Sequence, residues 1–146
     1  MDSVVRSDLL LTSAYDVYSA GSSRLRVVMT YSSQLFARLL VLAKTPVFKD
    51  NFAGDDVRFS HQFEDLEREM GKAQSMSENN QIDWYVVHEQ SEALLREQSK
   101  DLRAGVWLTW ALYQRESFPG LLAGLGLLHH LCTERWALVY PLKLRT

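Results

Sequence analysis

The side chains whose types could bind a metal or attack a substrate gather in one short segment, at His129, His130, Cys132 and Glu134. Adjacent residues of a helix point about 100° apart, so the two histidines cannot easily share one ion. His129 and Cys132 can face the same way, but a structural zinc site needs four ligands. The spacing favours packing side chains, and we predict no metal and no cofactor. A small hydrolase or metal-dependent enzyme that uses these residues is the rival interpretation.

Cys132 is the single cysteine of the chain, so an internal disulfide cannot form. This usage suits a reducing compartment. A catalytic thiol would need a neighbouring base and an electropositive pocket. The neighbours of Cys132 are apolar, which predicts an inert thiol on a buried helix face. We therefore predict no catalytic residue, and no enzyme.

Two clusters of charged residues remain. Asp55 and Asp56 lie among turn-forming residues and lack the alternating oxygen ligands and terminal glutamate of a calcium loop. With Arg58 they form our candidate interaction surface, because the chain contains no glutamate before Glu64 and its acidic turn stands out. In the second cluster, Lys100-Asp101-x-Arg103, the aspartate suits the start of a helix. A salt-bridge latch between helices is favoured there over catalysis.

Composition narrows the function further. The sequence contains no phosphate-binding loop, no G-x-S-x-G and no dinucleotide fingerprint after a strand. The net charge is −2 and basic residues are scattered, which argues against nucleic acid as a partner. The longest stretch without Asp, Glu, Lys or Arg, residues 117–133, is shorter than the roughly 20 residues of a membrane span. We expect no small-molecule substrate and a role in protein–protein interaction.

Hydrophobic spacing predicts an all-α fold, a compact bundle of about five or six helices built from antiparallel hairpins. We divide a single domain, 1–146, into N-terminal helices (1–45), a connector (46–59) and a helical core (60–146). The first part is expected to hold two helices that separate near Gly21, although Val27 and Val28 leave a strand possible. The chain stops just after the aromatic–proline corner at Tyr140, so we expect it to be the N-terminal part of a longer protein.

Capping residues and apolar spacing predict which faces are buried. Ser60 and Asp83 are expected N-caps, and 117–119 should open the last helix. Gly120, Gly124 and Gly126 predict the close approach of a neighbouring helix, under the ring of Trp107 or Trp110. The four predicted inward faces are Phe63, Leu66, Glu67 and Met70; Trp84, Val87, Ser91, Leu94 and Leu95; Leu102, Val106, Thr109, Trp110 and Tyr113; and Leu121, Leu122, Leu125, Leu128, Leu131, Cys132 and Trp136.

The last two-thirds of the sequence resembles the ImpA N-terminal domain family. The resemblance covers about residues 52–146 and rests on an ordered set of short motifs rather than on any one of them. It includes the upstream run 54–59, although the segment 51–53 departs from the proline-rich opening usual in the family. The residues that carry it, which we expect to be structural, are Asp83, Trp84, Lys100, Asp101, Leu102, Arg103, Trp107, Gly120, Leu121, Gly124, Leu125, Trp136 and Pro141.

The resemblance implies a bacterial type VI secretion role without catalytic residues. Members of the TssA type prime and coordinate tail tube and sheath polymerisation at the baseplate and distal end, and members of the TagA type stop the growing sheath. The expected partners are baseplate, tail tube, sheath or membrane-complex proteins, met in the bacterial cytoplasm at the secretion apparatus. The part that oligomerises or anchors lies beyond this domain, and self-association of the full-length protein stays open. A generic helical adaptor outside secretion is the other alternative.

Overall fold

The computed structural model describes residues 21–75 and 79–142, and the helix expected before Gly21 lies outside these ranges. Within them the α-helices are α2 (Gly21–Lys44), α3 (His61–Gly71), α4 (Trp84–Glu97) and α5 (Leu102–Glu134), joined by the 3₁₀ turns η2 (Val57–Phe59) and η3 (Lys72–Gln74). The described residues form isolated β-bridges but no strand. The all-α class is confirmed. The strand left open at residues 27–28 is wrong because both residues lie inside α2, and the count of five or six helices is not matched by these four.

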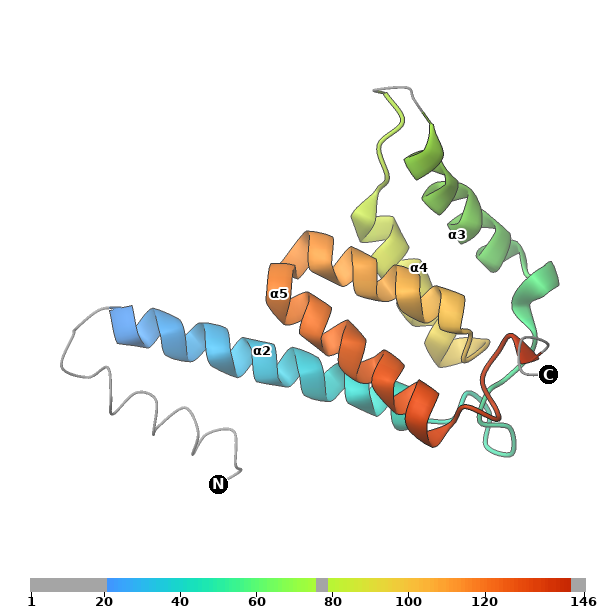
Figure 1. Cartoon of the computed structure of the whole chain (residues 1–146), viewed down its shortest axis with the longest axis horizontal. Coiled ribbons are helices and arrows are strands. Elements are labelled where there is room, and N and C mark those ends of the chain that lie inside the picture. The colour runs from blue at the N-terminus through green and yellow to red at the C-terminus, as the bar shows by residue number, and fades with distance from the viewer. Residues whose placement is uncertain (1–20, 76–78, 143–146) are drawn as a thin grey trace.

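α5 is broken inside its length at Ser117, whose φ of 59° and ψ of −142° are not helical. Figure 1 shows that the part after the break turns back alongside the part before it. Pro119 comes two residues after the break, where a helix does not need its missing N–H. The sequence expectation that 117–119 opens a helix therefore corresponds to this break, which separates two helices within α5.

The glycines of the second half of α5 lie where another backbone or ring comes close, as their positions predicted. A Cβ atom on Gly120 would lie 2.1 Å from the carbonyl oxygen of Leu112, and one on Gly124 would lie 2.7 Å from the Cα of Thr109. On Gly126 it would lie 2.5 Å from the ring of Phe36 in α2. The predicted neighbours, Trp107 and Trp110, are wrong. The halves of α5 and α2 meet over small residues instead.

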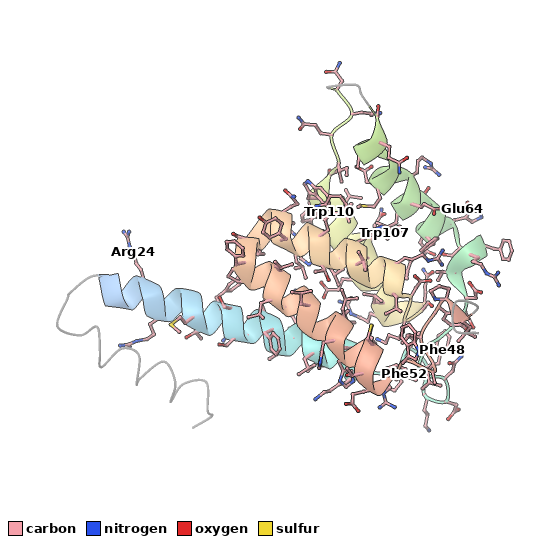
Figure 2. All side chains as sticks on the ribbon, in the orientation of Figure 1. Arg24, Phe48, Phe52, Glu64, Trp107 and Trp110 are labelled. Carbon is pink, nitrogen blue, oxygen red and sulfur yellow. The ribbon has the colours of Figure 1, made fainter. Side chains whose placement is uncertain are left out.

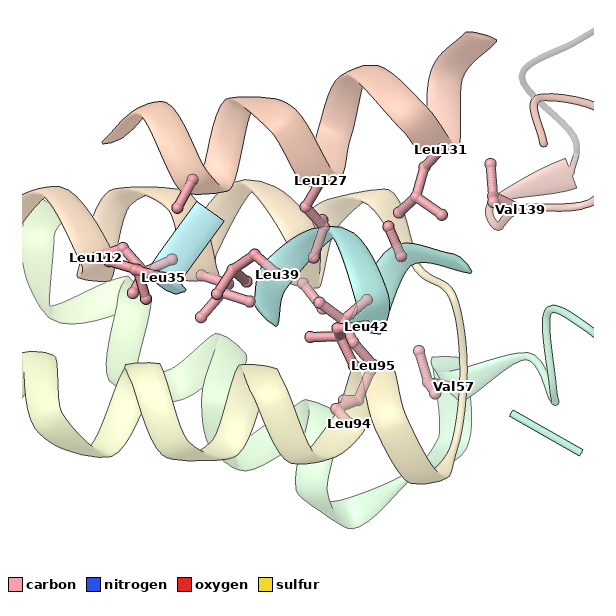
Figure 3. Packing of buried hydrophobic residues seen from close by; sticks show 14 of the residues in the cluster. Leu35, Leu39, Leu42, Val57, Leu94, Leu95, Leu112, Leu127, Leu131 and Val139 are labelled. Atoms are coloured by element: carbon pink, nitrogen blue, oxygen red, sulfur yellow. The ribbon is translucent and has the colours of Figure 1, made fainter. Parts of the chain in front are cut away.

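The main core lies where α2, α4 and both halves of α5 converge (Figure 3). Leucines from all three helices fill it, and Val57 and Val139 close one end. A smaller cluster under α3 is formed by Leu66, Met70, Val87 and Ala111. The buried leucines of the main core, each at most 7% exposed, are Leu35, Leu39, Leu42, Leu94, Leu95, Leu108, Leu112, Leu127 and Leu131.

The predicted inward faces are correct for most of α3, where only Glu67 is exposed, and for most of α4, and they are largely wrong for α5. Phe63, Leu66 and Met70 are buried in α3, and Val87, Ser91, Leu94 and Leu95 in α4. In α5 the buried residues are small ones and leucines, while Val106, Trp110, Tyr113, Leu122 and Leu125 are exposed, as is Trp136 beyond the end of the helix. Cys132 is also exposed, so its predicted burial is wrong. Apolar residues occur all around α5, so spacing does not single out one face. The face that packs most closely against the neighbouring helices carries alanines and glycines.

Candidate interaction surface

Three chain segments that are far apart in the sequence meet at a junction, which we define as residues 53–55, 98–102 and 140. The Lys100 N–H donates to the Ala53 carbonyl (2.8 Å), and the Asp55 N–H donates to the Gln98 carbonyl (2.9 Å). On the other side the Tyr140 N–H donates to the Lys100 carbonyl (3.0 Å), and the Leu102 N–H donates to the Tyr140 carbonyl (3.0 Å). The linker between α4 and α5 is therefore paired on both edges.

Lys100 is the buried centre of the junction, with only 1% of its surface exposed. Its Nζ donates to the carbonyls of Leu42 (2.7 Å) and Leu95 (2.9 Å), in the last turns of α2 and α4. The last carbonyls of a helix have no partner within it and carry the negative end of its dipole. One amine thus satisfies two helix ends. Desolvation, with a smaller contribution from the charge of Arg96, lowers the pKa of Lys100 from 10.5 to about 8.

Asp101 caps α5 rather than linking two helices. Its carboxylate accepts from the Arg103 N–H (2.8 Å) and from the Arg103 guanidinium Nη2 (2.8 Å) within the same turn. The guanidinium of Arg103 lies 4.4 Å from the centroid of the Phe63 ring in α3. The predicted salt bridge between helices is therefore wrong, because Asp101 pairs with Arg103 within the first turn of α5. The helices are joined through the Lys100 amine and the stacking of Arg103.

The candidate residues Asp55, Asp56 and Arg58 are exposed; Asp55 belongs to the junction, and Asp56 and Arg58 follow it directly. Asp56 accepts from the Arg58 N–H (3.1 Å) and pairs with the Arg58 Nε (2.8 Å), so it also starts η2. Asp56 and Arg58 line a hollow of about 190 Å³ with Pro141 and Leu142. The structure thus brings the acidic turn together with the end of the described chain.

Phe59 is a surface residue that sequence reasoning missed. Its ring is 87% exposed, the largest exposed fraction among the exposed large hydrophobic residues, and it follows Arg58 on η2. An aromatic ring held in water by a short rigid turn is a typical anchor for a protein partner. The neighbouring Phe52 differs, because the guanidinium of Arg135 lies 4.6 Å from its ring centroid, and Figure 2 shows it near the end of α5. The sequence pattern alone does not distinguish these two rings.

The other family residues mostly support the fold. Asp83 caps α4 as predicted, accepting from the Val86 N–H (3.1 Å). The Trp84 ring lies 5.3 Å from that of Trp110, and Trp107 lies 5.3 Å from Phe63. Trp136 lies beyond the end of α5 and is 48% exposed. Leu121 and Leu125 line a surface groove rather than the core.

A polar network of five side chains joins α2, α4 and α5. Glu92, 7% exposed, accepts from Arg38 of α2 and from Arg96 (2.8 Å), and its other oxygen faces the His88 Nε2 (3.0 Å). The Nδ1 of His88 faces the guanidinium of Arg115 in α5. Because a guanidinium only donates, the Nδ1 accepts and the Nε2 proton goes to Glu92. The i,i+4 spacings of His88 with Glu92 and of Glu92 with Arg96 were the signals of this network in the sequence.

Burial by itself would raise the pKa of Glu92, but the hydrogen bond from His88 and the charges of Arg38 and Arg96 outweigh it and lower the pKa. A lowered carboxylate pKa stabilises the fold above the unfolded value, near 4.5, and this stabilisation is lost as the pH falls below it. Glu92→Gln should therefore lower the free energy of unfolding by about 3 kcal/mol at pH 7. Urea unfolding measured from pH 7 to pH 3 should show that the difference in unfolding free energy between the wild type and Glu92→Gln becomes smaller below pH 4.5.

Glu89→Gln is the matched control, because Glu89 is exposed on the same helix. It should leave the unfolding free energy within about 0.5 kcal/mol of the wild type. A gap for Glu92→Gln that is constant with pH would contradict the role of the charged carboxylate.

The cluster from His129 to Glu134 does not converge. Across 21–75 and 79–142, no group of three or more His, Cys, Asp or Glu side chains is placed to hold a metal ion. The Nε2 of His130 is buried without a hydrogen-bond partner, whereas His129 and Cys132 face solvent. The same two ranges contain no helix that is long and apolar enough to cross a membrane.

These features define a helical domain held by a buried polar junction, with an exposed charged and aromatic turn beside it. The family model for the N-terminal region of ImpA, of the type VI secretion system, matches residues 44–146, and the chain belongs to this family. A solved structure, the N-terminal domain including the conserved ImpA_N region of the TssA component of the type VI secretion system from Burkholderia cenocepacia, is similar to it. The two share 36% identity with a TM-score of 0.60, over 70% of this chain and 39% of that chain. No curated protein matches the chain.

Proposed function

We propose that this chain is a non-enzymatic assembly component of a bacterial type VI secretion system, TssA-like, which coordinates or caps tail tube and sheath polymerisation at the baseplate and distal end. The observation that carries the proposal is the family match over residues 44–146, together with 36% identity to a TssA domain. The chain spans 39% of that TssA chain, so the activity of a whole protein is part of the proposal. The site of action is the bacterial cytoplasm, at the apparatus.

A deletion strain tests the coordinating role. If this protein coordinates polymerisation, cells without it assemble few sheaths or none, as counted by fluorescence microscopy of a labelled sheath subunit. Overlong sheaths would instead identify the TagA-like stopper. If the sheaths are normal in number and length and secretion is normal, the proposal is overturned. A generic helical adaptor that acts outside secretion would then be the remaining alternative.

The contact with the apparatus is assigned to the turn that carries Asp55, Asp56, Arg58 and Phe59. The first three are exposed and charged, and the ring of Phe59 is 87% exposed beside them. The turn is fixed to the linker between α4 and α5 by two backbone hydrogen bonds, from the Asp55 N–H to the Gln98 carbonyl and from the Lys100 N–H to the Ala53 carbonyl. It therefore presents these side chains with little entropy to lose on binding. A charged rim around one aromatic anchor suits a protein partner.

Charge reversal of Asp55 or truncation of Phe59 should reduce the capture of secretion components about tenfold. Asp55→Lys and Phe59→Ala leave the Asp56 cap in place, and Asp56→Asn keeps an oxygen to accept from the Arg58 N–H. Glu89→Lys makes the same charge change as Asp55→Lys on an exposed position of α4 and is the control.

The measurement is a pull-down from secretion-active cells, with the domain as bait and quantitative mass spectrometry of sheath, tube, baseplate and membrane-complex proteins. Circular dichroism melting verifies that each variant folds. If the wild type, Asp55→Lys and Phe59→Ala recover equal amounts of secretion components, this turn is not the contact surface. The role in secretion would then still be tested separately by the deletion strain.

A further inference from the structure

The two halves of α5 lie side by side (Figure 1), and small residues close the seam between them. Thr109 meets Gly124 along this seam, and Gly105 meets Leu128. α2 and α4 pack on the core side of α5, so its other side is left open. We call this open side the outer α5 face. Its large apolar side chains, each at least 40% exposed, are Val106, Trp110, Tyr113, Phe118, Leu122 and Leu125.

Helix geometry turns these side chains away from the core. Successive residues of an α-helix are about 100° apart, so Val106 and Trp110 lie opposite the buried side chains of Leu108 and Leu112. In the second half the same spacing puts Leu125 opposite the buried Leu127. Because one core lies under both halves, the two rows of large side chains point to the same side of the molecule.

The two rows form one continuous surface. The rings of Tyr113 and Phe118, one on each half of α5, have centroids 6.0 Å apart. Phe118, Leu122 and Leu125 line one hollow of about 430 Å³. On the first half, Trp110 lies three residues before Tyr113 and therefore beside it. A contiguous exposed apolar surface of this kind marks an interface.

The charges of α5 lie off this face. Within residues 104–133 the only Asp, Glu, Lys or Arg residues are Arg115 and Glu116. The guanidinium of Arg115 lies 4.9 Å from the centroid of the Tyr85 ring in α4. Glu116 forms a hydrogen bond with Tyr31 of α2. A second copy of the same face would therefore meet no like charge there.

The spacing of the sequence marks this face for burial. Val106, Trp110 and Tyr113 recur at the period of a buried helix face, as do Leu122 and Leu125, and this period predicted them as inward. In the structure these five side chains are 40–58% exposed. The periodicity of a buried face is thus present on a side that one copy of the chain leaves open.

The size and composition of the face suit a second copy. Its six exposed side chains offer about 600 Å² per copy, since a large side chain has an area of about 200 Å². A stable interface buries about 800 Å² per partner, so these side chains supply most of it. Transient partners bind through surfaces about as polar as the rest of the protein, whereas homodimer interfaces are more apolar. The outer α5 face is of the homodimer kind, unlike the charged turn at Asp55.

We propose that the outer α5 face is the interface of a homodimer, in which two copies of this chain pack this face against each other about a twofold axis. The same patch is then buried on both copies and every contact occurs twice. The turn that carries Asp55 and Phe59 lies outside α5, so the dimer presents two copies of it. This inference stands independently of the proposed function.

Sedimentation equilibrium of the full chain tests the dimer, in a reducing buffer because the thiol of Cys132 is exposed. The wild type should have the mass of two chains at micromolar concentrations. Val106→Glu with Leu125→Glu should raise the dissociation constant at least about a hundredfold. Val41→Glu is the matched control, because Val41 is 62% exposed on α2 outside the outer α5 face, and it should dimerise like the wild type.

A mixing experiment shows whether the face packs against itself. Val106→Lys with Leu125→Lys should be monomeric alone, like the double glutamate variant. An equal mixture of the two should form dimers that contain one chain of each kind and regain at least about tenfold of the lost affinity, because opposite charges then meet across the interface. Circular dichroism melting verifies that both variants fold.

Three outcomes would overturn the proposal. A wild type that is monomeric at every concentration would assign the outer α5 face to another occupant. A double glutamate variant that dimerises like the wild type would place the dimer contact elsewhere. A mixture of the folded glutamate and lysine variants that stays monomeric would show that the face does not meet its own copy.

Discussion

Replacing Gly120 with alanine should lower the free energy of unfolding by about 3 kcal/mol or more. The added Cβ would lie 2.1 Å from the carbonyl oxygen and 2.6 Å from the carbonyl carbon of Leu112. Both atoms belong to the backbone of the first half of α5, so relief requires the two halves to separate. Alanine is the better helix former by about 1 kcal/mol, and the clash must outweigh that gain.

Gly71 is the matched control for this substitution. It lies at the end of α3 with helical φ and ψ of −61° and −21°, and no atom lies within 4 Å of the position of its Cβ. Gly71→Ala should therefore leave stability unchanged or raise it by up to about 1 kcal/mol. Chemical denaturation followed by circular dichroism compares the two. A Gly120→Ala variant as stable as Gly71→Ala would show that the halves of α5 are not held at this distance.

The second large effect is expected at Lys100. Lys100→Met keeps the length of the side chain but leaves the carbonyls of Leu42 and Leu95 without their donor. Avoided desolvation of the charge offsets part of this loss, and we expect a net destabilisation of about 2 kcal/mol at pH 7. Lys49→Met, at an exposed loop position, should have no measurable effect.

The pH dependence of this difference is diagnostic. The folded pKa of Lys100, about 8, lies below the ordinary value of 10.5, so between these values the unfolded chain binds the extra proton. The stability contributed by Lys100 therefore rises with pH across this window, by about 3 kcal/mol in total. The neutral amine still donates to both carbonyls. Denaturant titrations from pH 7 to pH 10.5 should show the gap between wild type and Lys100→Met widening, and a gap that stays constant would contradict the lowered pKa.

Sequence patterns predicted the short helices well because each has only one possible buried face. In α3, Phe63, Leu66 and Met70 stand among charged residues, so the periodicity selects them. In α4, likewise, the N-cap at Asp83 and the spacing of Leu94 and Leu95 identify the start of the helix and its buried face. The helix cap and its buried stripe are local properties, and the amino-acid sequence specifies them locally.

The same reasoning failed for α5, where apolar residues surround the helix and leave its buried face undecided. Trp110 and Tyr113 were expected inside from their helical spacing, but the small residues Ala104, Ala111 and Gly124 are the ones that are buried. The interaction surface was only partly visible for a related reason. The acidic turn stands out in the sequence, whereas the burial of Lys100 depends on residues as distant as Leu42, 58 positions earlier, and no local pattern marks Phe59 as exposed.

The junction also dictates the order in which the chain can complete its fold. The carbonyl of Lys100 and the N–H of Leu102 are paired only with Tyr140, and the hydroxyl of Tyr140 donates to the Gly54 carbonyl (3.4 Å), 86 residues earlier. α3, α4 and α5 can form from local contacts while the chain is being synthesised. The linker that joins α4 to α5, however, has one open edge until residue 140 leaves the ribosome. A nascent chain that stalls before that point would hold its helices and the pairing of residues 53–55 with the linker, but it would lack the hydrogen bonds of Tyr140 to Lys100, Leu102 and Gly54.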